Sequence, residues 1–132
     1  MNKQQLITRL AELNFDKTQY WVITGGAMAL YGLRAETGDI DLGCTTQLME
    51  TLIASGYPVT TTSRGYRKVA IGDDVEIIEG WLLDRVVDVD GVPVISLSGL
   101  RAMKASLGRE KDLRDIALID AYLAENPGFQ HV

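Results

Sequence analysis

The spacing of hydrophobic residues divides the chain into a helical beginning, a strand-rich middle and a helical end. Leu6, Leu10 and Leu13 recur at the three- and four-residue intervals of an amphipathic helix, which predicts a helix over Asn2–Asn14. Further on, runs of apolar and β-branched residues bounded by turn residues predict strands. We expect these strands at Tyr20–Thr24, Asp39–Gly43, Val59–Thr62, Tyr66–Ile71, Val75–Glu79, Val86–Val89 and Val92–Ile95.

Helical spacing returns in two short segments between the strands and again in the last third of the chain. The further predicted helices are Ala27–Leu33, Thr46–Ser55, Leu97–Leu107 and Leu113–Ile119. No internal repeat or long linker divides the sequence, and 132 residues is a usual length for one domain. We therefore predict a single α+β domain over residues 1–132, with a mixed β-sheet flanked by helices.

Composition and charge narrow the classes of protein that this pattern allows. Hydrophobic residues make up 46% of the chain and charged residues 23%, as in ordinary globular proteins. No apolar run reaches the roughly 18 residues of a membrane helix, and the amino terminus lacks the pattern of a signal peptide. The single cysteine, Cys44, cannot form an internal disulfide, which favours the reducing cytoplasm. The net charge of −5 argues against extended nucleic-acid binding, but it allows a nucleotide to bind together with metal ions.

Two acids, Asp39 and Asp41, share one face of the predicted strand Asp39–Gly43, because alternate side chains of a strand point the same way. Two carboxylates side by side raise each other's pKa, and a divalent cation between them removes that cost. Oxygen ligands suit Mg²⁺, for which Mn²⁺ would substitute. The other interpretation is a solvated strand end that binds nothing, and the pair alone does not decide between the two.

Gly25 and Gly26 lie between the predicted strand Tyr20–Thr24 and the short helix that follows it. Glycines at such a place let the backbone approach a ligand closely, and the first N–H groups of a helix favour a phosphate. The alternative is a tight turn without a ligand. The order of glycines, helix, Arg34, Thr37 and acid pair would bring a phosphate cradle and a metal site onto adjacent strands.

These stretches resemble the nucleotidyltransferase superfamily, which shares the DNA polymerase β-like fold. The resemblance is nearest to its small bacterial branches, the AbiEii-like toxins and the lincosamide nucleotidyltransferases. It rests on two segments that together cover about a third of the chain. The first is Gly25-Gly26-Ala27, then Arg34-x-x-Thr37 and Asp39-Ile40-Asp41-Leu42; the second is Leu100-x-x-x-Lys104, then Gly108-Arg109-x-Lys111-Asp112-Leu113-x-Asp115-Ile116.

The resemblance implies a minimal nucleotidyltransferase fold, similar to the polymerase β palm, and an enzyme. Such enzymes transfer a nucleoside monophosphate from a nucleoside triphosphate such as ATP to a hydroxyl and release pyrophosphate. Two metal ions, held by three carboxylates, assist the transfer. In this chain Asp39 and Asp41 would be the first two carboxylates, and Gly25, Gly26 and Thr37 would belong to the nucleotide site.

The third carboxylate is expected on a later strand, and our choice is Glu76 in Val75–Glu79. Glu76 would complete the metal site and draw the proton from the acceptor hydroxyl. Glu79 should face the opposite side of a regular strand, and Asp74 falls in the preceding turn. The alternative for Glu76 is a residue at the rim of an amphipathic strand.

The remaining polar residues receive weaker predictions. Lys104 and Arg34 are candidate phosphate contacts, although a surface ion pair is the favoured interpretation of each. The charged residues between Lys111 and Asp115 are expected to form a solvated helix face. We expect Cys44 to be buried by packing, and His131, the one histidine, receives no role.

We therefore predict a cytoplasmic nucleotidyltransferase whose acceptor is a hydroxyl of a small molecule, an RNA end or a protein. The alternative is a non-catalytic relative that keeps the fold as a binding or regulatory protein, such as one component of a toxin–antitoxin pair. A plain metal- or nucleotide-binding module is a third possibility. A further hypothesis is that a second copy in a homodimer, or a partner protein, supplies the wall of the site that binds the acceptor.

Overall fold

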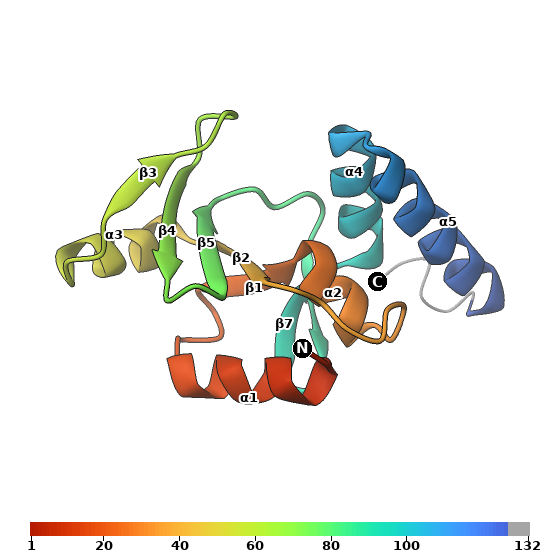
Figure 1. The fold of residues 1–132 in the computed structure, drawn as a ribbon, viewed down its shortest axis with the longest axis horizontal. Coiled ribbons are helices and arrows are strands. Elements are labelled where there is room, and N and C mark those ends of the chain that lie inside the picture. Colours follow the sequence, from red (N-terminus) through yellow and green to blue (C-terminus); the bar gives the residue numbers. More distant parts are fainter. Residues whose placement is uncertain (127–132) are drawn as a thin grey trace.

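The computed structural model describes residues 1–126, and Figure 1 shows the arrangement of its elements. The described residues form a seven-stranded mixed sheet and five helices. The helices are α1 (Lys3–Leu13), α2 (Thr24–Leu30), α3 (Thr46–Ala54), α4 (Leu97–Leu107) and α5 (Glu110–Glu125). The strands are β1 (Tyr20–Ile23), β2 (Ile40–Cys44), β3 (Val59–Thr61), β4 (Arg67–Ile71), β5 (Val75–Glu79), β6 (Val86–Val89) and β7 (Val92–Ile95). The predicted α+β class with a mixed sheet is confirmed, and His131 lies outside the described residues.

The order of strands in the sheet is β3-β4-β5-β2-β1-β7-β6, which places β2 near the centre. β2 pairs antiparallel with β1 and parallel with β5. In this register Asp41 lies beside Ile23 on one side and beside Glu76 on the other. Residues that pair across strands point to the same face of a sheet, so Asp41 and Glu76 share a face.

The opposite face of the sheet is occupied by apolar side chains and by α3. Val22, Leu42 and Ile77, which pair across the three central strands, are fully buried in the core. On the same face Arg67 joins Glu79 of β5 to Glu50 of α3, with Arg67 Nη2 at 2.6 Å from Glu79 Oε2 and at 2.8 Å from Glu50 Oε1. Glu79 therefore faces away from Glu76, as the strand period predicts.

Several element boundaries differ from the predicted ones. The second helix begins at Thr24 rather than at Ala27, so Gly25 and Gly26 form its first turn instead of a turn before it. β2 begins at Ile40, which leaves Asp39 immediately outside the strand. The last helix covers Glu110–Glu125. It begins before the predicted Leu113 because the side chain of Asp112 accepts a hydrogen bond from the backbone N–H of Arg109 and so caps the helix at Arg109.

Within residues 1–126 no helix has the length and the apolar character that a membrane crossing requires. The carboxyl-terminal helices α4 and α5 stand to one side of the central strands in Figure 1, and the β3–β4 hairpin, which forms one edge of the sheet, stands to the other. The central strands β1, β2 and β5 lie between these two groups, so the side chains on their shared face have elements from distant parts of the sequence around them.

Candidate functional site

A cavity of about 270 Å³ brings together residues from β2, β5, the start of α2, and the α4–α5 pair. Its lining includes every predicted site residue except Gly26. The lining residues are Thr24, Gly25, Arg34, Thr37, Asp39, Asp41, Glu76, Lys104, Arg109, Lys111 and Asp115. Positions as far apart in the sequence as Thr24 and Asp115 thus converge on one hollow.

Three carboxylates form one side of this cavity, and we call Asp39, Asp41 and Glu76 the acid wall. Asp41 and Glu76 are register partners on neighbouring parallel strands, which are about 4.8 Å apart. Glu76 Oε1 also lies 3.6 Å from Lys68 Nζ, a long ion pair on a half-exposed side chain. As the side chains stand, no three acid, cysteine or histidine groups among residues 1–126 are gathered closely enough to hold a metal ion.

Thr24 supports Asp41 from the start of α2, a role that no pattern in the sequence indicates. The Thr24 Oγ1 hydroxyl donates a hydrogen bond of 2.7 Å to Asp41 Oδ2. Thr24 has a φ of 52°, a left-handed conformation that is an outlier for a β-branched residue. Such strain persists only where the surroundings hold it, and it is typical of functional sites.

Burial sets the ionisation of Asp41. Burial of the carboxyl raises its pKa above the ordinary value, the hydrogen bond from Thr24 lowers it, and the negative charges of Glu76 and Asp39 raise it further. The positive charge of Lys104 acts in the opposite direction, more weakly. The net rise in the pKa means that the surroundings of Asp41, burial first, favour its protonated form more than water does.

The two glycines have different surroundings. A Cβ on Gly25 would lie 2.8 Å from Thr37 Oγ1 and 3.2 Å from Arg34 Nη1, so these two side chains of the cavity approach the bare backbone closely. A Cβ on Gly26 would instead lie 3.0 Å from Val22 Cγ1 in the core. Packing accounts for Gly26, and its predicted phosphate contact stays a prediction.

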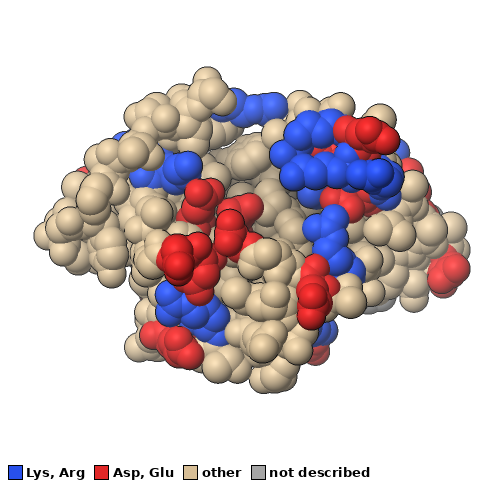
Figure 2. All heavy atoms as spheres, in the orientation of Figure 1, with Lys and Arg blue, Asp and Glu red and all other residues tan. Residues whose placement is uncertain are grey.

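Four basic residues also line the cavity, with Asp115 among them, and we call Arg34, Lys104, Arg109 and Lys111 the basic wall. Figure 2 shows acidic side chains gathered near the middle of this face and basic ones gathered over the ends of α4 and α5. A cavity divided in this way fits a ligand that combines phosphate groups with a cation.

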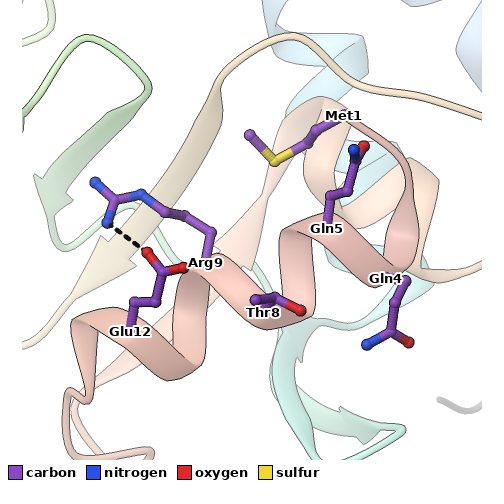
Figure 3. Close-up of a pocket in the computed structure, with 6 residues that line it drawn as sticks. All are labelled: Met1, Gln4, Gln5, Thr8, Arg9 and Glu12. Carbon is purple, nitrogen blue, oxygen red and sulfur yellow. Dashed lines mark hydrogen bonds and ion pairs between the residues drawn. The ribbon is translucent and has the colours of Figure 1, made fainter.

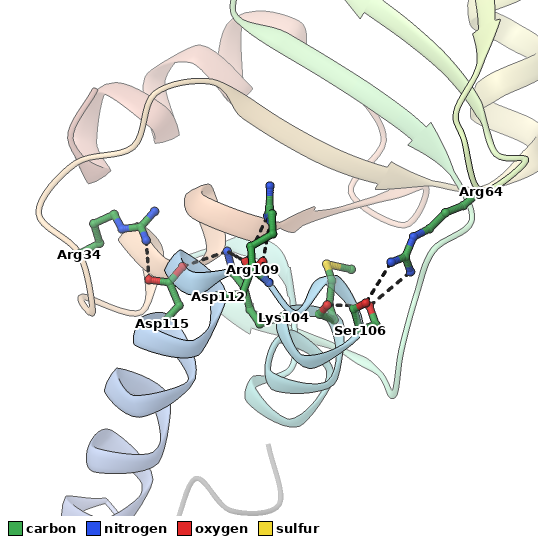
Figure 4. A network of polar contacts seen from close by, with 8 residues as sticks. Arg34, Arg64, Lys104, Ser106, Arg109, Asp112 and Asp115 are labelled. Carbon is green, nitrogen blue, oxygen red and sulfur yellow. Dashed lines mark hydrogen bonds and ion pairs between the residues drawn. The ribbon is translucent and has the colours of Figure 1, made fainter.

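Lys104 lies at the centre of the network of ion pairs drawn in Figure 4. Its Nζ is 3.0 Å from Asp115 Oδ2, an ion pair without hydrogen-bond geometry, and 3.5 Å from Asp112 Oδ1. Arg34 Nη2 lies 2.5 Å from Asp115 Oδ1, and Arg109 Nε lies 2.6 Å from Asp112 Oδ2. Burial raises the pKa of Asp112, but the hydrogen bonds from Arg109 and the charges of Arg109 and Lys104 outweigh it, so the pKa lies below its ordinary value.

Two of our predictions are wrong here. Lys104, predicted as a surface ion pair, is 3% exposed, and Asp112 and Asp115, predicted on a solvated face, are 0% and 3% exposed. The reason is that α4 and α5 pack side by side and enclose these three side chains between them. Spacing along one helix shows which residues share a face, but not whether a second helix covers that face.

The competing acids and Cys44 take other positions. Asp74 pairs with Arg9 of α1, with Arg9 Nε at 2.8 Å from Asp74 Oδ2, and Glu79 pairs with Arg67. Neither acid lines the cavity. Cys44 is buried, which confirms the prediction, and burial raises the pKa of its thiol to about 12.

A larger hollow of about 620 Å³ runs along the exposed side of α1 and is drawn in Figure 3. Its lining comes from Met1 and α1, and its charged residues are Arg9 and Glu12, whose side chains lie 3.4 Å apart. This shelf lacks the converging acids and bases of the smaller cavity, so we place the candidate site in the latter.

Comparisons with known proteins extend these observations. No protein-family model matches the chain, and no curated protein matches it. A solved structure of a protein described as a "putative nucleotidyltransferase" from Thermotoga maritima is similar, with a TM-score of 0.56 and 19% sequence identity. The match covers 96% of this chain and 97% of that one. The mixed sheet and helices of the described residues thus form a nucleotidyltransferase-like fold.

Proposed function

We propose that this protein transfers a nucleoside monophosphate from a nucleoside triphosphate to a hydroxyl group and releases pyrophosphate. The observation that carries the proposal is the division of one cavity into an acid wall and a basic wall. The nucleotidyltransferase-like fold supports the same class of reaction. The assignment to the AbiEii-like or lincosamide branch stays a prediction, as does a cytoplasmic location.

The acid wall has the chemistry of a site for Mg²⁺ or Mn²⁺. Its donors are all carboxylate oxygens, the ligands that hard divalent cations prefer. Burial, and after it the charges of Glu76 and Asp39, make the anionic form of Asp41 costly, which is why its pKa is raised, and a bound cation would offset that cost. Glu76 would have to exchange the long ion pair with Lys68 for the metal, and exposed pairs of this kind cost little to break. When bound, the metal would neutralise charge on the triphosphate and on the departing pyrophosphate.

The basic wall would bind the phosphates. Arg109 and Lys111 lie at the start of α5 on the rim of the cavity, while Lys104 is buried and fixed between two aspartates. Arg34, held by Asp115, lies next to Gly25, whose bare backbone leaves room for a phosphate oxygen. The buried lysine would hold its charge in place without rearrangement, which favours electrostatic stabilisation of phosphoryl transfer.

The transfer would be a displacement at the α-phosphorus. The acceptor oxygen forms a bond to the α-phosphorus while the bond from that phosphorus to the α–β bridging oxygen breaks, and pyrophosphate leaves. The acceptor proton passes to a carboxylate of the acid wall, for which Glu76 is our choice because its side chain is 45% exposed. The net charge of −5 favours a small acceptor over a long nucleic acid.

Binding of a nucleotide tests the proposal. We expect Mg²⁺ with ATP, or with another of the four nucleoside triphosphates, to raise the melting temperature of the wild-type protein. Asp39→Asn and Asp41→Asn should abolish the increase. Asp120→Asn, which removes an acid paired with Arg101 outside the cavity, should leave it unchanged.

Two outcomes would contradict parts of the proposal. A wild-type protein that binds no triphosphate in the presence of Mg²⁺ or Mn²⁺ would exclude it altogether. If a triphosphate binds but labelled nucleotide is transferred to nothing in a cell extract, the non-catalytic alternative, such as a toxin–antitoxin component, replaces it.

A further inference from the structure

A second, smaller cavity lies between the tip of the β3–β4 hairpin, the loop after β5, and α4. We call it the aromatic pocket, because Tyr66 and Trp81 form much of its wall, together with Arg64, Ile78 and Leu107. Its volume is about 150 Å³, which is about that of five water molecules in the liquid. It would therefore hold a small planar group but not a whole nucleotide.

The rings in the aromatic pocket are arranged as a stacking surface. Tyr66 and Trp81 have ring centroids 6.0 Å apart and an interplanar angle of 20°. The guanidinium of Arg64 lies over the Trp81 ring, 5.9 Å from its centroid. Arg64 Nη2 also donates a hydrogen bond of 3.0 Å to the Ser106 carbonyl, which links the hairpin to the end of α4 (Figure 4).

The backbone that carries Trp81 is strained. Gly80 and Trp81 have φ values of 75° and 54°, so a bulky side chain lies in the left-handed region. The loop that carries Trp81 packs tightly against α4. A Cβ on Gly99 of α4 would lie only 1.9 Å from the carbonyl oxygen of Leu83 in this loop. Strain of this kind at a ring that faces a cavity points to a binding role.

The aromatic pocket adjoins the charged cavity along β5. Ile78, in the pocket, lies two residues beyond Glu76 on the same strand and therefore on the same face. Two residues of a strand span about 6.6 Å. A ribose separates a nucleotide base from its first phosphate by a similar length.

We propose that the aromatic pocket binds the base of the nucleotide whose triphosphate occupies the charged cavity. This proposal rests on the proposed function and adds to it the contact that the base makes. Stacking on Tyr66 and Trp81 would accept any planar base, because every base has a π-face. The guanidinium of Arg64 would lie beside the base as a cation and hold the pocket closed against α4.

The test compares two ligands on the same protein. The dissociation constants of a nucleoside triphosphate and of inorganic tripolyphosphate are measured with Mg²⁺ by calorimetry for wild type, Trp81→Leu and Trp81→Phe. Both variants fill the space with an apolar side chain, but only phenylalanine keeps a ring. We expect the wild type to bind the nucleotide more tightly than tripolyphosphate. Trp81→Leu should weaken nucleotide binding by at least about fivefold and Trp81→Phe by less than about twofold. Tripolyphosphate binding should be unchanged in both.

The outcomes separate this proposal from the function on which it rests. Equal affinity of the wild type for both ligands would show that the base makes no contact and overturn the aromatic pocket as its site. An equal loss of affinity for the nucleotide and for tripolyphosphate in Trp81→Leu would also overturn the proposal, because it would show that Trp81 only supports the charged cavity. A loss of transfer in Trp81→Leu with nucleotide binding intact would also overturn it, since the pocket would then hold the acceptor. Failure of the wild type to bind either ligand would overturn both proposals.

Discussion

Thr24 and Asp41 meet where β1 gives way to α2, and the ionisation of Asp41 affects the stability of the protein. Because the pKa of Asp41 is raised above 3.8, its charged form is less favourable in the folded protein than in the unfolded chain. The folded protein therefore loses stability as the pH rises through the pKa that Asp41 has in the folded state. Below the pKa that it has in the unfolded chain, the carboxyl is protonated in both states and this loss is absent.

We therefore expect Asp41→Asn to raise the melting temperature at pH 7 in the absence of divalent metal. The gain should shrink as the pH falls through the raised pKa of the folded protein, because the wild-type carboxyl then takes up its proton, and it should vanish below 3.8. The matched control is Asp120→Asn, because the hydrogen bond from Arg101 lowers the pKa of Asp120 and its removal should bring no gain. Melting curves from pH 3.5 to 8 would check this, and a loss of stability in Asp41→Asn at neutral pH would contradict it.

The hydroxyl of Thr24 is the subject of a second prediction. Thr24→Ser keeps the hydroxyl that donates to Asp41 and should preserve stability at pH 7. Thr24→Val keeps the branched shape but removes the donor, which should cost about 1–3 kcal/mol, as for hydrogen bonds to charged groups. Urea unfolding of the two variants measures the difference. Equal stability would mean that the left-handed backbone, and not the hydrogen bond, fixes Thr24.

The pairing of β1 with β2 depends on the absence of a side chain at Gly43. Trp21 and Gly43 are register partners, and a Cβ on Gly43 would lie 2.0 Å from Trp21 Nε1. The Trp21 indole thus covers the strand where it passes Gly43. Its N–H is buried without a hydrogen-bond partner among the described residues.

Gly43→Ala should consequently destabilise the protein by about 1–3 kcal/mol or more, because the indole must move within a packed core. Gly38→Ala makes the same chemical change where a Cβ would have nothing within 4 Å, and it should be tolerated. Chemical denaturation with tryptophan fluorescence would compare them. Equal losses would show that the sheet can shift to accommodate the methyl group.

At the scale of the whole molecule, Lys104 joins α4 to α5 and, through Asp115 and Arg34, to the loop before β2. Its loss would leave two buried aspartates with less positive charge nearby. Removing one partner of a buried pair typically costs about 3–5 kcal/mol, much more than an exposed pair contributes.

We expect Lys104→Met to lose about that much stability, together with nucleotide binding. Lys111→Met removes the same charge from an exposed residue on the same cavity wall. It should change stability by less than about 0.5 kcal/mol while still weakening the binding of ATP and of tripolyphosphate. Unfolding in guanidinium and calorimetric titration separate the two effects. Intact stability in Lys104→Met would refute the structural role of this lysine.

Local patterns in the sequence determined the kinds of element and much of their order. Alternation and helical spacing located every described strand and helix, because these patterns follow from backbone geometry alone. The largest error is in α5, which was predicted to end at Ile119 and ends at Glu125. The same period placed Glu79 on the face away from Glu76. The acid pair and the glycines were visible as short motifs, so the acids of the cavity could be named in advance.

The tertiary structure decided which other residues these groups contact. The register of β2 with β5 sets Asp41 beside Glu76, and the packing of α4 on α5 buries Lys104 with Asp112 and Asp115. The contact of Thr24 with Asp41, and the pocket around Trp81, likewise join segments distant in the chain. The spacing of residues along a helix or strand shows which side chains share a face. Their burial, charge compensation and strain depend on which distant element covers that face. For this protein the sequence determined the list of chemical groups, and long-range packing decided which of them form a site.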